Sequence, residues 1–508
     1  MGSSASANLV TECKFQRFPG WGRMSSIDQP GSRVSLRPLK KSLLILICLS
    51  FLTALAWHWQ KSRLNSEDPL AFPSLLRAAA DEPSLASAAI GLCVLDSVGR
   101  VVFEQNARTA FIPASTLKTI TTGTALEILG PEFRFQTQVK SSSPIAEGIL
   151  NGDLVVRGGA DPMLSLEDLT RWAAELKKKG LKRITGSVVG DGRIFSGTRF
   201  DDFWNWGDIG NGYGSPVSGL NLEHNRFTAT LRPGSAPGAP TFFQQAIPEV
   251  PAVEWTNEAI TGPPGSGDQV VIHGGELTRR IFFRGTVPSD SSVFSVIGAV
   301  PDPELFAAHH FRQALLSAGI EVLGEPTTVD LLRLQNRNIP DTPVILIEHL
   351  SIPLLDIVTS IHAKSDNHEC ECLYRFLGVH LQKEPDAVIR GHWQKKEISF
   401  EGLRMEDGCG LARADSIRPL DLAMVQFRLA TGPQGAAFES SLLSHFDGRL
   451  RAKGGAMSGI HSYTGSATSA DGKKYFFAFM VNHHADSKSA YRLRDRIVSS
   501  LLGTTSIP

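Results

Sequence analysis

Strand signals of the same kind stand near both ends of this 508-residue chain, and they constrain its fold more than any other feature. Residues 88–105 predict a β-hairpin, with two apolar runs joined by the turn Asp96-Ser-Val-Gly99. Residues 451–468 and 473–484 predict two further strands, and residues 487–502 predict a closing amphipathic helix. We therefore expect one sheet built from both ends of the chain, with the long middle inserted into that domain.

The middle region, residues 132–345, has a different character. It is rich in Gly, Pro and short strand-like runs, with turn signals about every ten residues. Two helices, residues 166–179 and 303–318, are expected to interrupt these runs. We expect a mostly β insertion of one or two domains.

Longer helices return after this region. Apolar periodicity predicts helices over residues 353–364, 369–377 and 419–430. The first part of the outer domain is then residues 61–131 and the second part residues 346–508. The fold class expected is α/β (α+β), with an antiparallel sheet flanked by helices.

The first 60 residues form a separate region. A polar stretch, residues 1–41, ends in a basic cluster, and an apolar run from Leu43 to Trp57 follows within residues 42–60. This pattern predicts either a cleaved signal peptide or an uncleaved signal anchor, which would hold the chain in the inner membrane through residues 43–59. In both cases we expect residues 1–41 in the cytoplasm and the residues after about 60 in the periplasm.

Charge and cysteine content exclude some function classes. The 51 basic and 51 acidic residues give a formal net charge of zero, so no basic excess indicates nucleic acid as a partner. Four cysteines lie in the region expected to be exported, which allows one or two disulfides: Cys93, Cys370, Cys372 and Cys409. Their spacing does not match a zinc site, so we expect no metal and no cofactor.

One short stretch carries a candidate nucleophile. Residues 111–130 predict a loop at Pro113 followed by a helix, with Ser115 near its N-terminus and Lys118 one turn further on the same face. A hydroxyl and a neutral amine held in this way can act as nucleophile and base. A helix-capping serine beside a solvated lysine is the simpler interpretation of this pair taken alone.

Two partner motifs follow in order along the chain. Ser365-Asp-Asn367 is expected in a loop between two helices, and Lys453-Gly-Gly455 at the start of a strand. In the order S-x-x-K, S-x-N, K-x-G, the three motifs resemble those of the active-site serine penicillin-recognising enzymes.

Further stretches narrow the resemblance to one family. Residues 407–413, DGCGLAR, are similar to the D-G-S-G-L-S-R of the D-alanyl-D-alanine carboxypeptidase/endopeptidase family, the S13-type low-molecular-mass penicillin-binding proteins. Residues 152–162, 204–208 and 215–225 also resemble stretches of that family, and the match covers about residues 68–503. The resemblance implies a penicillin-binding transpeptidase/β-lactamase-like domain, peptidoglycan stem peptides as substrates and β-lactams as inhibitors.

The resemblance also implies roles for individual residues. Ser115 would form the acyl-enzyme with Lys118 as its base, Ser365 would relay a proton, and Asn367 would hold the peptide backbone. The backbone N–H groups of Ser115 and Ala456 would form the oxyanion hole. The positive charge of Lys453 would face the site, and Gly454 and Gly455 would lie beside the substrate. Asp208, Arg413 and Ser458 would line a pocket for the diamino acid of the stem peptide.

The strand motif departs from the family pattern. The family has K-T-G-T or K-T-G-S, whereas Gly454 and Ala456 carry no hydroxyl here. Those hydroxyls help bind the terminal carboxylate of the substrate, and each lost hydrogen bond to a charged group is worth about 1.5–3 kcal/mol. The departure favours cross-link cleavage or a weakened enzyme, and the alternative is a peptidoglycan-binding protein with little turnover. The insertion and the DGCGLAR stretch argue against a β-lactamase or esterase.

Overall fold

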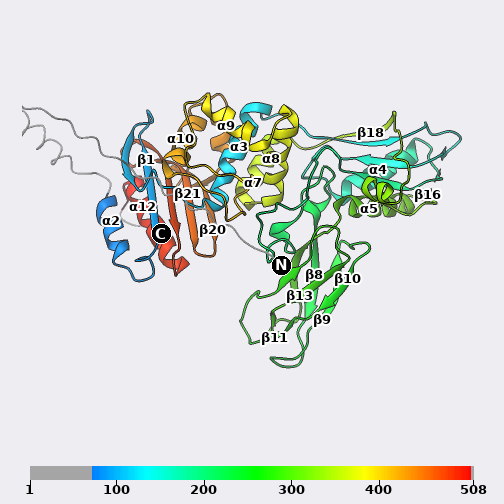
Figure 1. Cartoon of the computed structure of the whole chain (residues 1–508), viewed down its shortest axis with the longest axis horizontal. Helices are drawn as coiled ribbons and strands as arrows, with labels where there is room; N and C mark the ends of the chain where they lie inside the picture. Colours follow the sequence, from blue (N-terminus) through cyan, green and yellow to red (C-terminus); the bar gives the residue numbers. More distant parts are fainter. Residues whose placement is uncertain (1–70, 505–508) are drawn as a thin grey trace, which may run out of the picture. The chain divides into compact units, whose positions relative to one another are not determined.

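The computed structural model describes residues 71–504, which belong to one compact unit (Figure 1). The predictions for the leader, residues 1–41, and for the apolar segment, residues 42–60, lie outside the described residues. Among residues 71–504, no helix combines the length and the apolar character needed to cross a bilayer.

A six-stranded antiparallel sheet joins the two ends of the chain, as the sequence predicts. Its strand order is β19-β20-β21-β22-β1-β2. The bounds are β1 Ala89–Leu95, β2 Val101–Gln105, β19 Leu443–His445, β20 Leu450–Met457, β21 Ile460–Thr468 and β22 Lys474–Asn482. The N-terminal hairpin joins the C-terminal strands through the pairing of β1 with β22, from Ala89 opposite Asn482 to Leu95 opposite Phe476.

Both faces of this sheet are covered, which explains why β22 is buried at every position after its first residue. Phe476, Ala478 and Met480 pack into the core that contains the central helices, whereas Phe477 and Phe479 pack into the core beneath α12. Figure 1 shows α12 and α2 on one side of the strands and α10 with α3 on the other. The bounds are α2 Phe72–Ala80, α3 Lys118–Leu129, α7 Leu354–Lys364, α8 Asn367–Leu381, α9 Pro385–Gln394, α10 Pro419–Ala430, α11 Gly435–Ser441 and α12 Ser487–Leu502.

One part of the insertion is a mixed α/β structure. A five-stranded sheet has the order β17-β7-β5-β3-β18, and a small three-stranded sheet has the order β16-β6-β4. Trp172 and Phe311, from α4 and α5, pack edge to face within the core of this part. The bounds are β3 Gln136–Ser141, β4 Ile149–Leu150, β5 Leu154–Arg157, α4 Leu166–Lys178, β6 Arg183–Ile184, β7 Val188–Asp191, α5 Pro303–Ser317, β16 Glu321–Val322, β17 Thr327–Thr328, α6 Val329–Leu334 and β18 Val344–Leu350.

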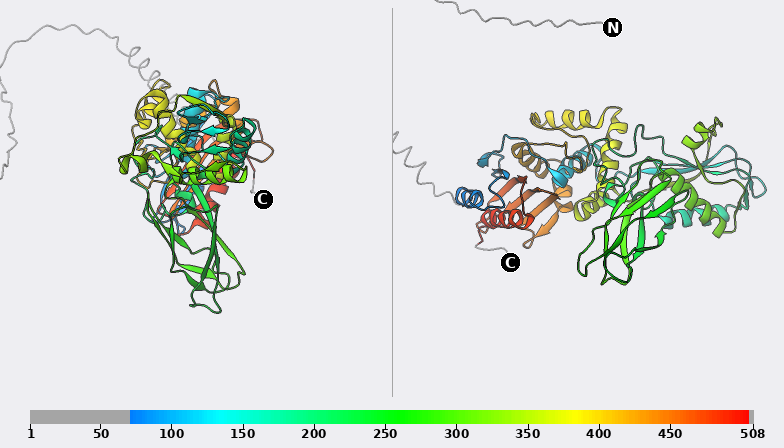
Figure 2. Two further views of the ribbon diagram at one scale, coloured as in Figure 1. Left: turned by 90° about the vertical axis from the view of Figure 1, so that its right-hand side faces the viewer. Right: turned by 60° about the horizontal axis from the view of Figure 1, so that its bottom comes forward.

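The other part of the insertion consists of β-strands and short turns (Figure 2). Its core contains three aromatic rings that stack against one another, those of Phe243, Trp255 and Phe283. Two short 3-10 turns, η2 Gly212–Gly214 and η3 Glu223–Asn225, precede its first strand. The strand bounds are β8 Arg226–Arg232, β9 Phe242–Ile247, β10 Glu254–Asn257, β11 Ile260–Gly262, β12 Val271–His273, β13 Arg280–Arg284, β14 Thr286–Pro288 and β15 Phe294–Ala299.

The structure departs from the predicted elements in three ways. Residues 451–468 form two strands, β20 and β21, because Gly459 adopts a φ of +74° and reverses the chain. Helices α6, α9 and α11 are not among the helices predicted from the sequence. Cys93, Cys370, Cys372 and Cys409 are all free and buried, so neither of the disulfides that the sequence allowed is formed among them. Strand β18 crosses the predicted end of the insertion at residue 345 and pairs with β3 of the insertion. The domain boundaries stay predictions.

Candidate active site

Ser115 and Lys118 occupy the start of a helix, as the sequence predicts. Ser115 lies in a 3-10 turn, η1 Ala114–Leu117, that leads directly into α3. Lys118 is the first residue of α3 and is 0 % exposed. Its Nζ donates to Ser115 Oγ at 3.0 Å, to Asn367 Oδ1 at 2.6 Å and to the carbonyl oxygen of Cys409 at 2.7 Å. These three hydrogen bonds hold the amine within reach of the Ser115 hydroxyl.

The Ser365–Asn367 motif forms the connection between α7 and α8. Ser365 ends α7 in the left-handed region, with a φ of +58°, and Asp366 caps α8 by accepting a hydrogen bond from the backbone N–H of Glu369. Asn367 uses both ends of its amide. Its Oδ1 accepts from Lys118, and its Nδ2 donates to the carbonyl oxygen of Tyr213 at 2.8 Å. The motif therefore faces the nucleophile at one end and the insertion at the other.

Lys453 extends from β20 toward the same motif. Its Nζ donates to Ser365 Oγ at 2.8 Å and to the carbonyl oxygen of Gly454 at 2.8 Å. Burial, followed by the positive charge of Lys118, lowers the pKa of Lys453 to about 7. This amine can change its protonation state near neutral pH, with Ser365 as its direct hydrogen-bond partner.

The two glycines after Lys453 lie in different surroundings. A Cβ placed at Gly455 would lie 2.5 Å from Ser462 Oγ and 2.6 Å from the backbone N of Ser115, so any side chain there would push the strand away from the nucleophile. A Cβ at Gly454 would meet only Tyr463, at 3.6 Å and 3.8 Å. Position 454 therefore has room for a threonine, and position 455 requires glycine.

The second half of β20 has a free edge. Its neighbour β19 pairs with it only from Leu450 to Ala452, and no other strand within residues 71–504 pairs with the Lys453–Met457 segment on that side. An extended ligand can add to such an edge through backbone hydrogen bonds. Ala456, a predicted oxyanion residue, is exposed on this segment.

A pocket of about 400 Å³ joins six of the predicted site residues, which are Ser115, Asp208, Asn367, Arg413, Ala456 and Ser458. Asp208 accepts hydrogen bonds from Tyr213 Oη at 3.0 Å and Asn205 Nδ2 at 2.9 Å. Burial and the adjacent Asp208 carboxylate raise the pKa of Tyr213 to about 12. Arg413 Nη2 donates to the carbonyl oxygen of Ser458 at 3.1 Å. The pocket thus contains the carboxylate of Asp208 and the guanidinium of Arg413, and each is held in place by hydrogen bonds to neighbouring residues.

The other predicted residues lie around this pocket. Ser365 lines an adjoining cavity of about 680 Å³, whose wall also includes Tyr213 and Asn367. Lys118 and Lys453 are buried, and they reach the two cavities through Ser115 and Ser365. Every residue predicted for the site is therefore placed in or beside one cleft, while the individual roles stay predictions.

The sequence interpretation had assigned no function to Asp407. Its buried carboxylate accepts a hydrogen bond from Trp204 Nε1. It also accepts hydrogen bonds from the backbone N–H groups of Cys409, Gly410, Leu411 and Ala412. This carboxylate shapes the loop whose Cys409 carbonyl oxygen accepts from Lys118. An aspartate followed by Gly-Cys-Gly is a turn signal of this kind, so the sequence did contain the information.

Arg226, in the insertion, was also missed. Its Nη1 donates to Asp366 Oδ2 at 2.6 Å and its Nη2 to Asp366 Oδ1 at 3.1 Å. Although burial opposes it, the charge of Arg226 holds the pKa of Asp366 well below its usual range. Next to this pair, His224 Nε2 lies 2.9 Å from Glu369 Oε1. No local sequence signal links Arg226 to Asp366, because 140 residues separate them.

Within residues 71–504, two clusters contain residue types that can ligate metal, namely His224 with Asp366 and Glu369, and Glu371 with Asp407 and Cys409. In the first cluster, the Arg226 guanidinium already occupies both oxygens of Asp366. In the second, Asp407 is surrounded by backbone N–H donors. These donor sets favour structural hydrogen bonding over metal binding.

Comparison with known proteins identifies the family. The model of the D-Ala-D-Ala carboxypeptidase 3 (S13) family matches residues 73–501. The chain belongs to this family. The D-alanyl-D-alanine carboxypeptidase DacB of Haemophilus influenzae is 28% identical over 414 residues, which cover 76% of this chain and 83% of that protein. The D-alanyl-D-alanine carboxypeptidase of Actinomadura sp. is 27% identical over 461 residues, which cover 83% and 82%.

A solved structure extends the S13 assignment to the fold. The crystal structure of penicillin binding protein 4 (dacB) from Haemophilus influenzae matches with a TM-score of 0.70 and 24% identity, and the match covers 79% of this chain and 91% of that one. The family, the fold class and the serine D-Ala-D-Ala peptidase class inferred from the sequence are confirmed.

Proposed function

We propose that this S13 protein hydrolyses peptidoglycan stem peptides or cross-links through an acyl-enzyme on Ser115. The observation that carries the proposal is the 3.0 Å hydrogen bond between Lys118 Nζ and Ser115 Oγ, with the amine buried and the hydroxyl at the wall of the 400 Å³ pocket. In this role the amine must be neutral when it accepts the hydroxyl proton.

Acylation then follows from the placement of these groups. Ser115 Oγ attacks the carbonyl carbon between two D-alanines while its proton passes to Lys118 Nζ. The N–H groups of Ser115 and Ala456 are proposed to stabilise the resulting oxyanion, and Asn367 to bind the peptide backbone. As the C–N bond breaks, the leaving amine takes a proton from Ser365 Oγ, which is replaced from Lys453 Nζ 2.8 Å away. Water releases the acyl group by the reverse sequence.

The pocket beside Ser115 is proposed to bind the diamino acid of the stem peptide. Asp208 can bind the ammonium of a diamino acid, and Arg413 can bind its carboxylate as a fork. Because Gly454 and Ala456 supply no hydroxyl to a terminal carboxylate, we expect cross-link cleavage to suffer less than carboxypeptidase activity.

We also propose that residues 42–60 direct the chain to the periplasm, either as a signal peptide or as an inner-membrane anchor. The apolar run after a basic cluster supports this proposal. N-terminal sequencing of the protein from a fractionated cell would separate the two outcomes, and cytoplasmic recovery of the whole chain would contradict both.

Labelling with a fluorescent penicillin tests the central proposal. We expect one covalent label per chain in the wild-type protein and none in the Ser115→Ala variant, with D-alanine released from a pentapeptide or a cross-linked dimer cleaved. The rival function, a wall-binding protein with little turnover, would give muropeptide binding with no acyl-enzyme in the mass spectrum. That outcome would overturn the catalytic proposal.

A further inference from the structure

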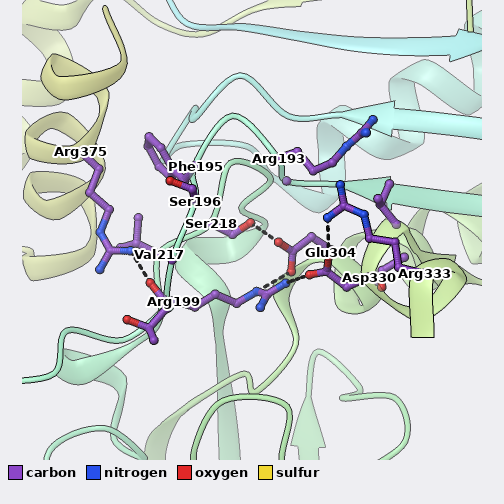
Figure 3. Close-up of a pocket in the computed structure, with 16 residues that line it drawn as sticks. Arg193, Phe195, Ser196, Arg199, Val217, Ser218, Glu304, Asp330, Arg333 and Arg375 are labelled. Atoms are coloured by element: carbon purple, nitrogen blue, oxygen red, sulfur yellow. Dashed lines mark hydrogen bonds and ion pairs between the residues drawn. The ribbon is translucent and has the colours of Figure 1, made fainter. Parts of the chain in front are cut away.

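Another cavity, of about 490 Å³, lies away from Ser115, between the α/β part of the insertion and α8 (Figure 3). Its walls come from the loop after β7, from the N-terminal ends of α5 and α6, and from Arg375 on α8. None of the residues assigned to the active site lines it. The volume is within the range of about 300–1,000 Å³ that is typical of small-molecule sites.

The floor of this cavity is an ion network in which every carboxylate oxygen accepts a hydrogen bond from a protein donor. Arg199 donates to Glu304 Oε2 at 2.9 Å, to Asp330 Oδ2 at 2.8 Å and to Glu276 Oε1 at 2.7 Å. The other oxygen of Glu304 accepts from Ser218 Oγ at 2.6 Å. Ser218 and Glu304 are nine-tenths or more buried. The carboxylates of the floor are thus occupied by protein donors and leave little capacity for a cationic ligand.

Donors on the walls are less fully used. Arg333 has a single partner among the described residues, Asp330 Oδ1 at 3.4 Å, and its side chain is 54% exposed. On the opposite side, Arg375 donates through Nε to Glu371 Oε1 at 3.0 Å and through Nη1 to the carbonyl oxygen of Thr198 at 2.6 Å. Figure 3 shows Arg333 and Arg375 on opposite sides, with Arg199 between them.

This combination of occupied acceptors and available guanidinium donors selects a ligand with a carboxylate. We propose that the cavity is a second binding site, which holds a carboxylate-bearing peptide through Arg333, with Arg375 as the facing charge. Guanidinium groups bind carboxylates in a planar fork, and the cavity can accommodate several residues of a peptide. The identification of this peptide with a peptidoglycan stem rests on the proposed function; the site itself does not.

The cavity is linked to the active site through one helix. Arg375 lies on α8, whose first residue is Asn367, the partner of Lys118. A peptide bound at Arg375 therefore contacts the same rigid element that carries a group of the active site. This connection allows one strand of the polymer to be held while another is cleaved.

The test uses the full-length protein with Ser115 blocked by penicillin, so that only a second site can bind. A disaccharide tetrapeptide muropeptide is titrated into this acylated protein by calorimetry. A tetrapeptide with its carboxyl groups amidated and free D-alanine are titrated in parallel. We expect one binding event for the muropeptide, and binding about tenfold weaker or weaker for the amidated peptide because a charge-assisted hydrogen bond is lost. Stoichiometric binding of D-alanine alone would identify the reaction product, in place of the stem peptide, as the source of the carboxylate.

Arg333→Ala is the decisive variant, and Arg337→Ala is its matched control. Both residues are exposed, they lie four positions apart, and both changes remove one positive charge, but only Arg333 lines the cavity. We expect Arg333→Ala to weaken muropeptide binding about tenfold and Arg337→Ala to leave it unchanged. No binding to the acylated protein, or equal binding by the two variants, would overturn the proposal. Penicillin acylation itself reports on Ser115 and is read separately, so failure of this site and failure of the proposed function are distinguishable.

Discussion

The two walls of the active-site cleft differ in how completely their polar groups are held. On the helical wall, Lys118 has three acceptors and Asn367 uses both ends of its amide. On the strand wall, the free edge of β20 presents Gly454, which carries no side chain, and Ala456, which carries no polar one. The difference indicates that the groups proposed for bond cleavage are positioned before substrate arrives, while the strand wall supplies no hydroxyl to a terminal carboxylate.

Removing Lys118 would break the helical wall and has the largest expected effect. Lys118→Met removes the amine that accepts the Ser115 proton, so we expect acylation by penicillin to slow by about 10²- to 10⁴-fold, the usual contribution of a general base. The measurement is the rate of covalent labelling under single-turnover conditions. Lys364→Met is the control, because Lys364 is exposed and lies close to the motif but has no side-chain bond to Ser115. Equal rates for the two variants would show that Lys118 is not the base.

Removing Arg226 would test whether the insertion supports the helical wall. Arg226→Met leaves the buried carboxylate of Asp366 without its cation, and breaking a buried pair in this way costs about 3–5 kcal/mol of unfolding free energy. Urea denaturation would measure the loss. The double variant Arg226→Met/Asp366→Asn should recover part of it, because no uncompensated charge remains. Unchanged stability in Arg226→Met would mean that the pair is not structural.

The same pair predicts a pH dependence of stability. The folded-state pKa of Asp366 lies below the ordinary aspartate value of about 3.9, so its contribution to stability is complete above that value and is lost as the pH falls toward the folded-state pKa. We expect the stability difference between wild type and Arg226→Met to shrink below about pH 4. A difference that stays constant down to pH 2 would contradict this assignment.

Adding a hydroxyl to the strand wall should make the two walls more alike. Gly454→Thr has space beside Tyr463, and a hydroxyl that reaches the substrate carboxylate is worth about 1.5–3 kcal/mol, or roughly 10- to 100-fold in kcat/KM for D-alanine release. Gly455→Thr is the opposing control, since its Cβ would lie 2.6 Å from the backbone N of Ser115. A gain with Gly454→Thr would show that the catalytic groups are intact. No gain would place the missing contact elsewhere.

Lys453 provides the smallest and most specific test. Its pKa of about 7 means that it loses its charge as the pH rises through neutrality. Because Lys453 is proposed to replace the proton of Ser365, we expect kcat to fall above about pH 7. A substrate with an amidated terminal carboxyl group should show the same fall, because this proton transfer does not involve that group. The depressed pKa also predicts that this residue's effect on stability becomes more favourable as the pH rises from about 7 toward the unfolded-state value near 10.4, by at most about 1.4 kcal/mol per pH unit.

Much of this fold was predictable from local patterns. The hairpin of β1 and β2, helices such as α4, α5 and α12, and the division by a long insertion all follow from apolar periodicity and turn residues. The turn at Gly459 was missed because one glycine in a strand-like run does not distinguish a reversal from a bulge. The short helices α6 and α11 contain seven residues or fewer, too few for a periodic signal.

The sequence by itself determined which chemical groups are present and in what order. Three short motifs, each placed at the end of a helix or on a strand, sufficed to predict the nucleophile, its base and the facing lysine. Only the tertiary structure decided how these groups are held. Tyr213 and Arg226 reach the Ser365–Asn367 motif from the insertion, and Asp407 places the carbonyl oxygen that accepts from Lys118. The contacts of Tyr213, Arg226 and Lys118 join residues more than a hundred positions apart, and their geometry follows from packing, which no local pattern records.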